Sequence, residues 1–310
     1  MRIVRNIQGL APAHKGAAIA IGNFDGLHKG HHAVLRRMME QAERMGVPKA
    51  VMTFEPHPRR FFKPDLPIRR IYPLHHKLRL LEMLGVEIVY LLPFNAQMAD
   101  LSAQDFMQQI LQDGLEAKTV ITGYDFCFGK GRSGNCANLQ GFAEQTDAFS
   151  YEAVEAQKLD EEIYSSTAIR GAIEEGNMEA AARLLGRPYS VIGRVKHGDA
   201  RGREMGFPTA NISLPTLLKP AYGVYAVRVS LPDGKLQNGV ANWGVRPTMD
   251  GMREWLEVHL FDFKGDLYGQ RLEVALMSKL RNEQRFDSLD ALKAQIAKDC
   301  SHAKEILGCA

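Results

Sequence analysis

Over the first 185 residues, short runs of apolar residues alternate with longer segments in which apolar residues recur every three or four positions. The short runs have the length of buried strands, and the longer segments have the spacing of amphipathic helices. This alternation predicts an α/β domain in which a doubly wound parallel sheet is covered by crossover helices. We expect its strands at "AAIAIG", "KAVMTF", "VEIVYLLPF" and "KTVITG".

Helix signals separate these strands. The helix after "AAIAIG" repeats its apolar residues on one face, at Val34, Leu35, Met38, Met39, Ala42 and Met45. Gly85 follows a second helical segment, where a left-handed cap is expected. Ser102 is positioned to cap a third helix, with Asp105 three residues on. A last helical region runs from "SSTAIR" to "NMEAAARLLG".

The pattern changes at Pro188 to short strands separated by turn residues. Asp233 and Gly234 lie between two strand-like runs, which is a hairpin signal. Helical spacing returns only in "RFDSLDALKAQIAKDCSHAKEIL". We therefore predict a small antiparallel β-barrel with a terminal helix. The fold class is α/β plus β, with domains at 1–186 and 187–310. The strands are expected at "YSVIGRV", "GVYAVRVS", "LQNGVANWG", "LEVHLFDF" and "RLEVALMSKL".

Length and composition agree with two soluble globular domains. A chain of 310 residues exceeds the usual size of one domain. The 39 basic and 36 acidic residues give a net charge of +3, which does not favour long nucleic acid as a partner. The four cysteines form no C-x-x-C pair and are interpreted as free thiols of a reducing cytosol. No signal peptide or membrane-spanning run is recognised, so we expect a cytoplasmic protein.

The stretch "AIAIGNFDGLHKGHH" places a glycine turn between a strand and a helix. Such turns lie where open α/β sheets bind ligands, and the N–H groups of a helix N-terminus favour phosphate. Gly22, Gly26 and Gly30 allow close approach of the backbone. His28 and His31 are placed to donate hydrogen bonds to phosphate oxygens. The alternative is that both histidines are merely exposed in a loop.

The H-x-G-H arrangement resembles the nucleotidyltransferase superfamily, in which a phosphate or carboxylate displaces pyrophosphate from ATP. Further motifs narrow the resemblance to the prokaryotic bifunctional riboflavin kinase and FAD synthetase family, over nearly the whole chain. They are "TFEPHP", "GYDFCFGKGR", "SSTAIR", "GREMGFPTANI", "NWGVRPTM", "LEVHLFDFKGDLYG" and "LRNEQRF".

In the first half, the resemblance implies a Rossmann-like FMN adenylyltransferase (FAD synthetase) domain. His28 and His31 would be catalytic, stabilising adenylyl transfer, and Asp125 would help to place the flavin. The residues implied in binding ATP and its phosphates are Gly22, Phe24, Asp25, Gly26, Ser165, Ser166, Thr167 and Arg170. Without the resemblance, "SSTAIR" could equally be a plain helix cap.

In the second half, the resemblance implies a riboflavin kinase domain. Thr209 and Asn211 would meet Mg²⁺, and Gly206, Pro208 and Thr209 would bind ATP phosphates. Glu257 would be the general base toward riboflavin; without the resemblance, strand alternation alone favours a solvated glutamate. Arg281 would lie near the flavin. "VKHGDARGRE" is interpreted as a flap near the phosphates or as an idle hairpin tip.

The implied enzyme phosphorylates riboflavin with ATP to give FMN, and then adenylylates FMN with a second ATP to give FAD and pyrophosphate. Its small-molecule partners are riboflavin, FMN, FAD and ATP, and its cofactor is Mg²⁺; the sequence does not indicate an oligomeric state.

Two alternatives stay open at this point. H-x-G-H also occurs in class I aminoacyl-tRNA synthetases, and "MSK" at 277–279 hints at their second signature, but Leu276 stands where that signature has lysine. The other alternative is a flavin-binding regulatory protein with an inactive domain. It is disfavoured because both halves carry the residues matched to chemistry.

Overall fold

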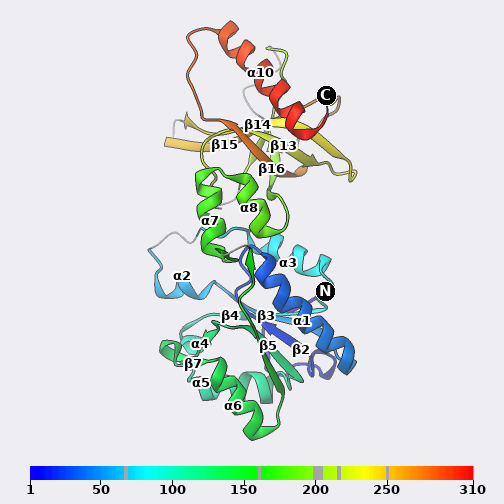
Figure 1. Cartoon of the computed structure of the whole chain (residues 1–310), viewed down its shortest axis with the longest axis vertical. Helices are drawn as coiled ribbons and strands as arrows, with labels where there is room; N and C mark the ends of the chain where they lie inside the picture. Colours follow the sequence, from blue (N-terminus) through cyan, green and yellow to red (C-terminus); the bar gives the residue numbers. More distant parts are fainter. Residues whose placement is uncertain (66–68, 160–161, 198–204, 215–217, 249–250, 310) are drawn as a thin grey trace. The chain divides into compact units, whose positions relative to one another are not determined.

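In the computed structural model the chain forms two compact units, Met1–Ile68 with Leu74–Ser165, and Arg69–Pro73 with Ser166–Ala310 (Figure 1). The structure describes residues 1–65, 69–159, 162–197, 205–214, 218–248 and 251–309. The predicted flap therefore lies largely outside the described residues. Compactness divides the chain near residue 165, whereas the boundary near residue 186 was inferred from the change of pattern at Pro188 and stays a prediction.

The first unit is built on a six-stranded sheet in which every neighbouring pair is parallel, as predicted. Its strand order is β1-β4-β3-β2-β5-β8. The sequence patterns missed both edge strands, because β1 and β8 are short and mostly not fully buried. The strands are β1 (Arg2–Val4), β2 (Ala18–Ile21), β3 (Lys49–Glu55), β4 (Ile88–Pro93), β5 (Thr119–Gly123) and β8 (Ser150–Val154).

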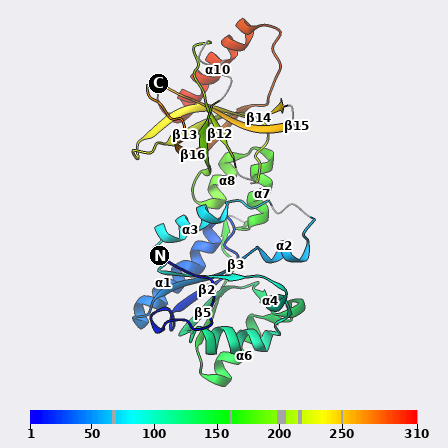
Figure 2. The same cartoon turned by 180° about the vertical axis from the view of Figure 1, so that it is seen from behind.

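Helices cover both faces of this sheet. On one face, α1 (Lys29–Met45) and α3 (Leu74–Met83) bury apolar residues against β2 and β3. On the other face lie the π-helical segment η2 (Phe106–Gly114) and α6 (Cys136–Thr146). Figure 2 shows the same layering from behind. Shorter elements are η1 (Pro12–His14), α2 (Pro58–Phe62), α4 (Ala96–Asp100), α5 (Ala103–Asp105), η3 (Lys130–Arg132), β6 (Cys127–Phe128), β7 (Gly134–Asn135), β9 (Lys158–Leu159) and β10 (Glu162–Ile163).

The helix signals of the first unit are confirmed in detail. Gly85 has a φ of 89°, a left-handed conformation that glycine adopts without strain. The Ser102 hydroxyl accepts a hydrogen bond from the Asp105 N–H at 3.0 Å. Of the apolar face predicted for α1, Met45 is the exception, because it lies in the last turn and is 39 % exposed.

The second unit contains a closed barrel of six antiparallel strands in the order β11-β12-β15-β14-β13-β16, followed by α10 (Leu289–Leu307). The predicted hairpin joins β13 to β14, and Gly234 within it has a φ of 84°. One strand, β12, was missed because it has only four residues and overlaps the end of the motif "GFPTANI". The strands are β11 (Tyr189–Lys196), β12 (Ala210–Ser213), β13 (Gly223–Ser230), β14 (Leu236–Thr248), β15 (Gly251–Leu260) and β16 (Arg271–Arg281).

Two helices before the barrel belong to the same compact unit. They are α7 (Ser166–Glu175) and α8 (Met178–Leu185). The apolar face of α8 is buried, with Met178 and Leu185 fully inaccessible, and the helix packs against β11 and β16. The last helical region read from the sequence therefore completes the barrel unit.

Candidate active sites

The strand order of the first unit reverses at β2. From β2 the sheet runs through β3 and β4 in one direction and through β5 and β8 in the other. Ligands of open α/β sheets bind at this reversal, beyond the carboxyl ends of the strands. The turn at residues 22–28 follows β2 here, and Asp125 follows β5, which pairs with β2 in parallel register. The fold thus brings two of the predicted site segments to one edge of the sheet.

The turn after β2 is held in an unusual backbone conformation. Phe24 and Leu27 have φ values of 49° and 45°, and Gly26 between them has a φ of 86°. Non-glycine residues rarely adopt this region, and they persist there only where the surroundings enforce it. Asp25 is 7 % exposed. A short, buried turn of this kind holds its backbone groups in fixed directions.

His28 and His31 form one unit at the start of α1. His28 is the N-cap, and its Nδ1 accepts a hydrogen bond from the His31 N–H at 3.3 Å. The two rings stack with centroids 3.6 Å apart. A Cβ atom at Gly30 would lie 3.1 Å from the His28 ring, so glycine is the residue that leaves room for it. Two imidazoles are therefore placed side by side at a helix N-terminus, where anions bind.

A thiol on α6 contacts the Asp125 loop, and two hydroxyls link β5 and β8 beside it. The Cys136 thiol approaches the Tyr124 carbonyl oxygen at 3.3 Å, and the Thr122 and Tyr151 hydroxyls are 2.8 Å apart. Burial raises the pKa of Tyr151, so this phenol stays protonated at neutral pH. Asp125 itself is exposed at the tip of the loop.

The "SSTAIR" residues divide between the two compact units. Ser165 ends the first unit, whereas Ser166, Thr167 and Arg170 lie in α7 of the second. The Arg170 Nε donates a hydrogen bond to the Arg69 carbonyl oxygen at 3.0 Å. Their predicted placement opposite the histidines stays a prediction.

The second unit holds a cavity of about 420 Å³. It is lined by predicted residues from separate parts of the chain, namely Thr209, Asn211, Glu257 and Arg281. The rest of its wall includes the apolar side chains Phe207, Val224, Val240, Phe286, Leu292 and Ile296. A mainly apolar cavity with a few convergent polar groups is the usual form of a small-molecule site. Gly206 has a φ of 86° and lies just before this wall, with Pro208 exposed beside it.

Three polar residues stand in one row across the barrel wall. Asn211 on β12 pairs with Glu257 on β15, and Glu257 pairs with Asn242 on β14. Directly opposed residues of antiparallel strands have Cβ atoms about 4.5–5.5 Å apart, so these side chains are neighbours on the cavity face. His259, two residues along β15, lines the same cavity, and its Nδ1 lies 2.9 Å from the Pro208 carbonyl oxygen.

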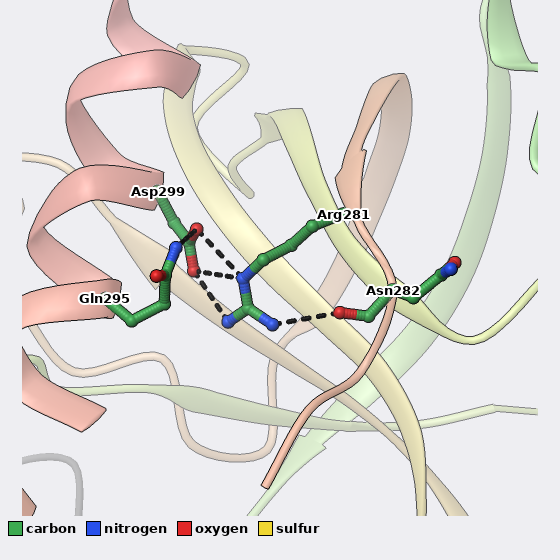
Figure 3. Close-up of polar contacts among 4 residues, drawn as sticks. All are labelled: Arg281, Asn282, Gln295 and Asp299. Carbon is green, nitrogen blue, oxygen red and sulfur yellow. Dashed lines mark hydrogen bonds and ion pairs between the residues drawn. The ribbon is translucent and has the colours of Figure 1, made fainter. Parts of the chain in front are cut away.

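Arg281 ends β16 and is anchored to the terminal helix. Its Nε lies 3.0 Å from both carboxylate oxygens of Asp299, and a terminal nitrogen lies 2.8 Å from Oδ2. Figure 3 shows Gln295 and Asp299 on α10 facing this guanidinium, and Gln295 donates to Asp299 at 2.9 Å. Asp299 is 5 % exposed. The ion pair therefore fixes one wall of the cavity and leaves the flat guanidinium in it.

Comparison with known proteins agrees with this division. Residues 10–168 match the family model of FAD synthetase, and residues 185–307 match that of riboflavin kinase. The bifunctional riboflavin kinase/FMN adenylyltransferase of Haemophilus influenzae is 43 % identical over 304 residues, covering 98 % of both chains. The chain belongs to the bifunctional riboflavin kinase/FMN adenylyltransferase family.

Other relatives give the same result. Bifunctional riboflavin kinase/FMN adenylyltransferases of Escherichia coli K12 and Pseudomonas fluorescens are 43 % and 44 % identical, over 99 % of this chain and 98 % of theirs. A crystal structure from Streptococcus pneumoniae, described as a macrolide-efflux protein, aligns with a TM-score of 0.86 at 33 % identity over 96 % of each chain. That description applies to the Streptococcus protein. Within the described residues, no helix of our chain is long and apolar enough to cross a membrane.

Membership of the riboflavin kinase/FMN adenylyltransferase family argues against the aminoacyl-tRNA synthetase alternative. Met277, Ser278 and Lys279 lie within β16, as expected, where Lys279 donates to Asn282. The sequence did not single out two residues that line or support the sites. Asn242 lines the cavity, and strand alternation, which places it on the same face as Glu257, could have indicated it. Lys77 lies in a helical segment whose pattern does not indicate its contacts.

Proposed function

We propose that the chain makes FAD in two ATP-dependent steps at two separate sites. The barrel unit transfers the γ-phosphoryl group of ATP to riboflavin, giving FMN, and the sheet unit transfers AMP from a second ATP to FMN. The observation that carries this proposal is that each unit holds its own cluster of polar groups, one on the His28 turn and one in the Glu257 cavity. Membership of the family supports the same pair of reactions.

In adenylyl transfer, an FMN phosphate oxygen attacks the α-phosphorus of ATP, and pyrophosphate leaves. The residues of the chain stabilise the negative charge that develops on the phosphate oxygens. His28 and His31 donate hydrogen bonds from a preorganised stack, and the turn from Gly22 to Gly26 adds backbone groups. Preorganised donors of this kind contribute most where no reorganisation is needed during reaction. Ser165, Ser166, Thr167 and Arg170 are proposed to bind ATP phosphates, and Asp125 is proposed to help place the flavin.

In the kinase step, the Glu257 carboxylate accepts the proton of the ribityl hydroxyl as that oxygen attacks the γ-phosphorus, and the bond to the β,γ-bridging oxygen breaks to release ADP. Its position in the middle of β15, between Asn211 and Asn242, holds it against the cavity. Because phosphoryl transfer leaves little covalent work to the protein, positioning supplies most of the rate. Gly206, Pro208 and Thr209 are proposed to meet the ATP phosphates.

The neighbouring donor set fits a magnesium ion. Asn211 is 6 % exposed, and its Oδ1 has no hydrogen-bond partner among the described residues. A buried amide oxygen of this kind is costly unless an outside group satisfies it. The Thr209 hydroxyl is two residues away and lines the same cavity. Mg²⁺ prefers oxygen ligands and shares phosphate oxygens with its site, so Thr209 and Asn211 would hold it together with ATP. When bound, the ion neutralises charge on the transferred phosphoryl group.

The flavin ring suits the apolar part of the cavity. Phe286, Leu292 and Ile296 supply the apolar contacts, and the Arg281 guanidinium supplies a flat cationic surface fixed by Asp299.

We also propose a cytoplasmic location, on the basis of the free cysteines and the ordinary composition.

A single assay tests the proposed function. Purified protein is incubated with riboflavin and ATP, with and without Mg²⁺, and the flavins are separated by chromatography. FMN should appear first and FAD second, both only with Mg²⁺. Formation of FAD from added FMN without any conversion of riboflavin would contradict the kinase assignment. Retention of flavin without any conversion would favour a regulatory binding protein.

A further inference from the structure

A buried lysine stands directly behind the strained turn. Lys77, on α3, is 9 % exposed and comes from a segment otherwise read only as an amphipathic helix. Its Nζ donates to the Asn23 carbonyl oxygen at 3.0 Å and to the Thr53 hydroxyl at 3.1 Å. Thr53 is fully buried at the end of β3, next to β2 in the sheet. An ammonium group is rarely buried without a specific arrangement of acceptors, because removing its charge from water is costly.

The contact with Asn23 fixes the direction of the next backbone N–H group. The Asn23–Phe24 peptide is trans, so its C=O and N–H point in opposite directions. While the carbonyl is held on Lys77, the Phe24 N–H must point away from Lys77. Rotation of this peptide would break the hydrogen bond to a charged donor, which is among the stronger kinds.

The Phe24 N–H has no acceptor among the residues that the structure describes. Phe24 is 1 % exposed, and its N–H makes no hydrogen bond with any residue that the structure describes. Buried backbone N–H groups are nearly always paired, so this one calls for an acceptor from outside the chain. The neighbouring His28 and His31, at the helix N-terminus, define that acceptor as anionic.

We infer that Lys77 is a positioning residue for adenylyl transfer: by holding the Asn23 carbonyl, it keeps the Phe24 N–H directed at a phosphate oxygen of ATP. The inference rests on the proposed binding of ATP phosphates at the His28 turn. Lys77 acts through the backbone and keeps the strained turn in its binding conformation before ATP arrives. Thr53 supports it from β3, because its hydroxyl accepts from the ammonium group and donates to the same Asn23 carbonyl oxygen at 3.4 Å.

The test compares Lys77→Met with Lys118→Met. Lys118 is exposed just before β5, and only its backbone makes hydrogen bonds among the described residues. In Lys77→Met, kcat/KM for ATP in FMN adenylylation should fall about 10- to 100-fold, the scale of one hydrogen bond to a charged group. KM for FMN and the riboflavin kinase rate of the same sample should not change. Lys118→Met should match the wild type, and Lys77→Arg should recover most of the loss, because it restores a charged donor.

Several results would overturn the inference. They are unchanged ATP kinetics in Lys77→Met, a loss confined to KM for FMN, or no recovery in Lys77→Arg. If Lys77→Met does not fold, Thr53→Val carries the test, and wild-type ATP kinetics in that variant count against the inference. If the proposed function itself were wrong, His28→Ala/His31→Ala would keep adenylylation, and this result distinguishes the two failures. If that double variant loses adenylylation while Lys77→Met keeps it, only the role of Lys77 is wrong.

Discussion

The two candidate sites are built in different ways. In the sheet unit, the chemistry lies at the ends of elements, where a turn follows β2, a loop follows β5 and a helix N-terminus carries two histidines. In the barrel unit, it lies in the middle of strands, where Asn211, Glu257 and Asn242 meet across three neighbouring strands. One site depends on backbone directions over a short stretch of chain, and the other depends on register between distant segments.

This difference predicts how each site responds to change. A strained turn holds N–H groups that no side-chain substitution can replace, so its supports matter as much as its ligands. In the barrel wall, the backbone hydrogen bonds between strands set the spacing of the side chains. Replacing one side chain there should leave the positions of its neighbours unchanged. The two reactions should therefore be separable by single substitutions, each with the other reaction as an internal control.

The largest effect is expected from His28→Ala/His31→Ala. FMN adenylylation should fall about 10³-fold or more, since one preorganised donor commonly contributes 10²–10³. Riboflavin kinase turnover should stay within the error of the wild-type value. Both are measured by flavin chromatography on one preparation. A folded double variant that loses both activities would show that the sites are not separate.

Glu257→Gln makes the reciprocal separation. The substitution keeps size and most hydrogen bonding but removes the proton acceptor, so kinase turnover should fall about 10²- to 10⁴-fold while adenylylation persists. His259→Ala is the matched control, because His259 lines the same cavity on the same strand. Near-native kinase turnover in Glu257→Gln would end the general-base assignment. It would pass to His259 only if His259→Ala lost that turnover.

The same contrast decides which features the sequence could predict. The strand, turn and helix around His28 were predicted because they are consecutive in the sequence, whereas the positive φ values of Phe24 and Leu27 and the stacked rings of His28 and His31 were not. The parallel sheet was predicted because strand and helix patterns alternate before residue 186. The barrel was predicted because short strands replace this alternation from Pro188. The two edge strands were missed, since β1 and β8 lack the fully buried pattern of the central strands.

Register and tertiary contacts could not be predicted from these patterns. Asn242 and Glu257 are 15 positions apart, and only the pairing of β14 with β15 makes them neighbours. Lys77 and Asn23 are 54 positions apart, and nothing in a helical segment indicates that its lysine turns inward to a carbonyl. The partner of Arg281 was likewise hidden, because the acceptor lies 18 positions later on α10.

A smaller effect, confined to the barrel, is expected from Asp299→Asn. The amide leaves the Arg281 guanidinium without its charged acceptor, so the free energy of unfolding should fall by about 1.5–3 kcal/mol. KM for riboflavin should rise, and adenylylation should not change. Both tryptophans, Trp243 and Trp255, lie in the second unit, so fluorescence reports its unfolding alone.

Asp287→Asn is the control for this variant, because Asp287 is an exposed carboxylate just before α10. It should unfold like the wild type. Equal stability of Asp299→Asn and the wild type would mean that the ion pair drawn in Figure 3 does not hold the helix to the barrel.

The smallest effect should come from alkylating thiols, and it should touch only one site. Cys127 is exposed in the sheet unit, with its Sγ 3.6 Å from the Asp125 carbonyl oxygen. In the barrel unit, burial and the Asp299 charge raise the pKa of Cys300 to about 11, so almost none of it is thiolate at pH 8. The contribution of this half-buried thiol to stability is present below about pH 8.5, the usual thiol pKa, and is lost as the pH rises toward 11. Iodoacetamide at pH 8 should therefore label Cys127 long before Cys300, as peptide mapping would show.

After labelling of Cys127, adenylylation should slow about threefold, equivalent to about 0.65 kcal/mol, because the added group crowds the Asp125 loop, while kinase turnover stays constant. Cys127→Ser should remove this sensitivity, whereas a parallel fall in kinase turnover would mean that the thiols of the barrel unit are not protected by their burial.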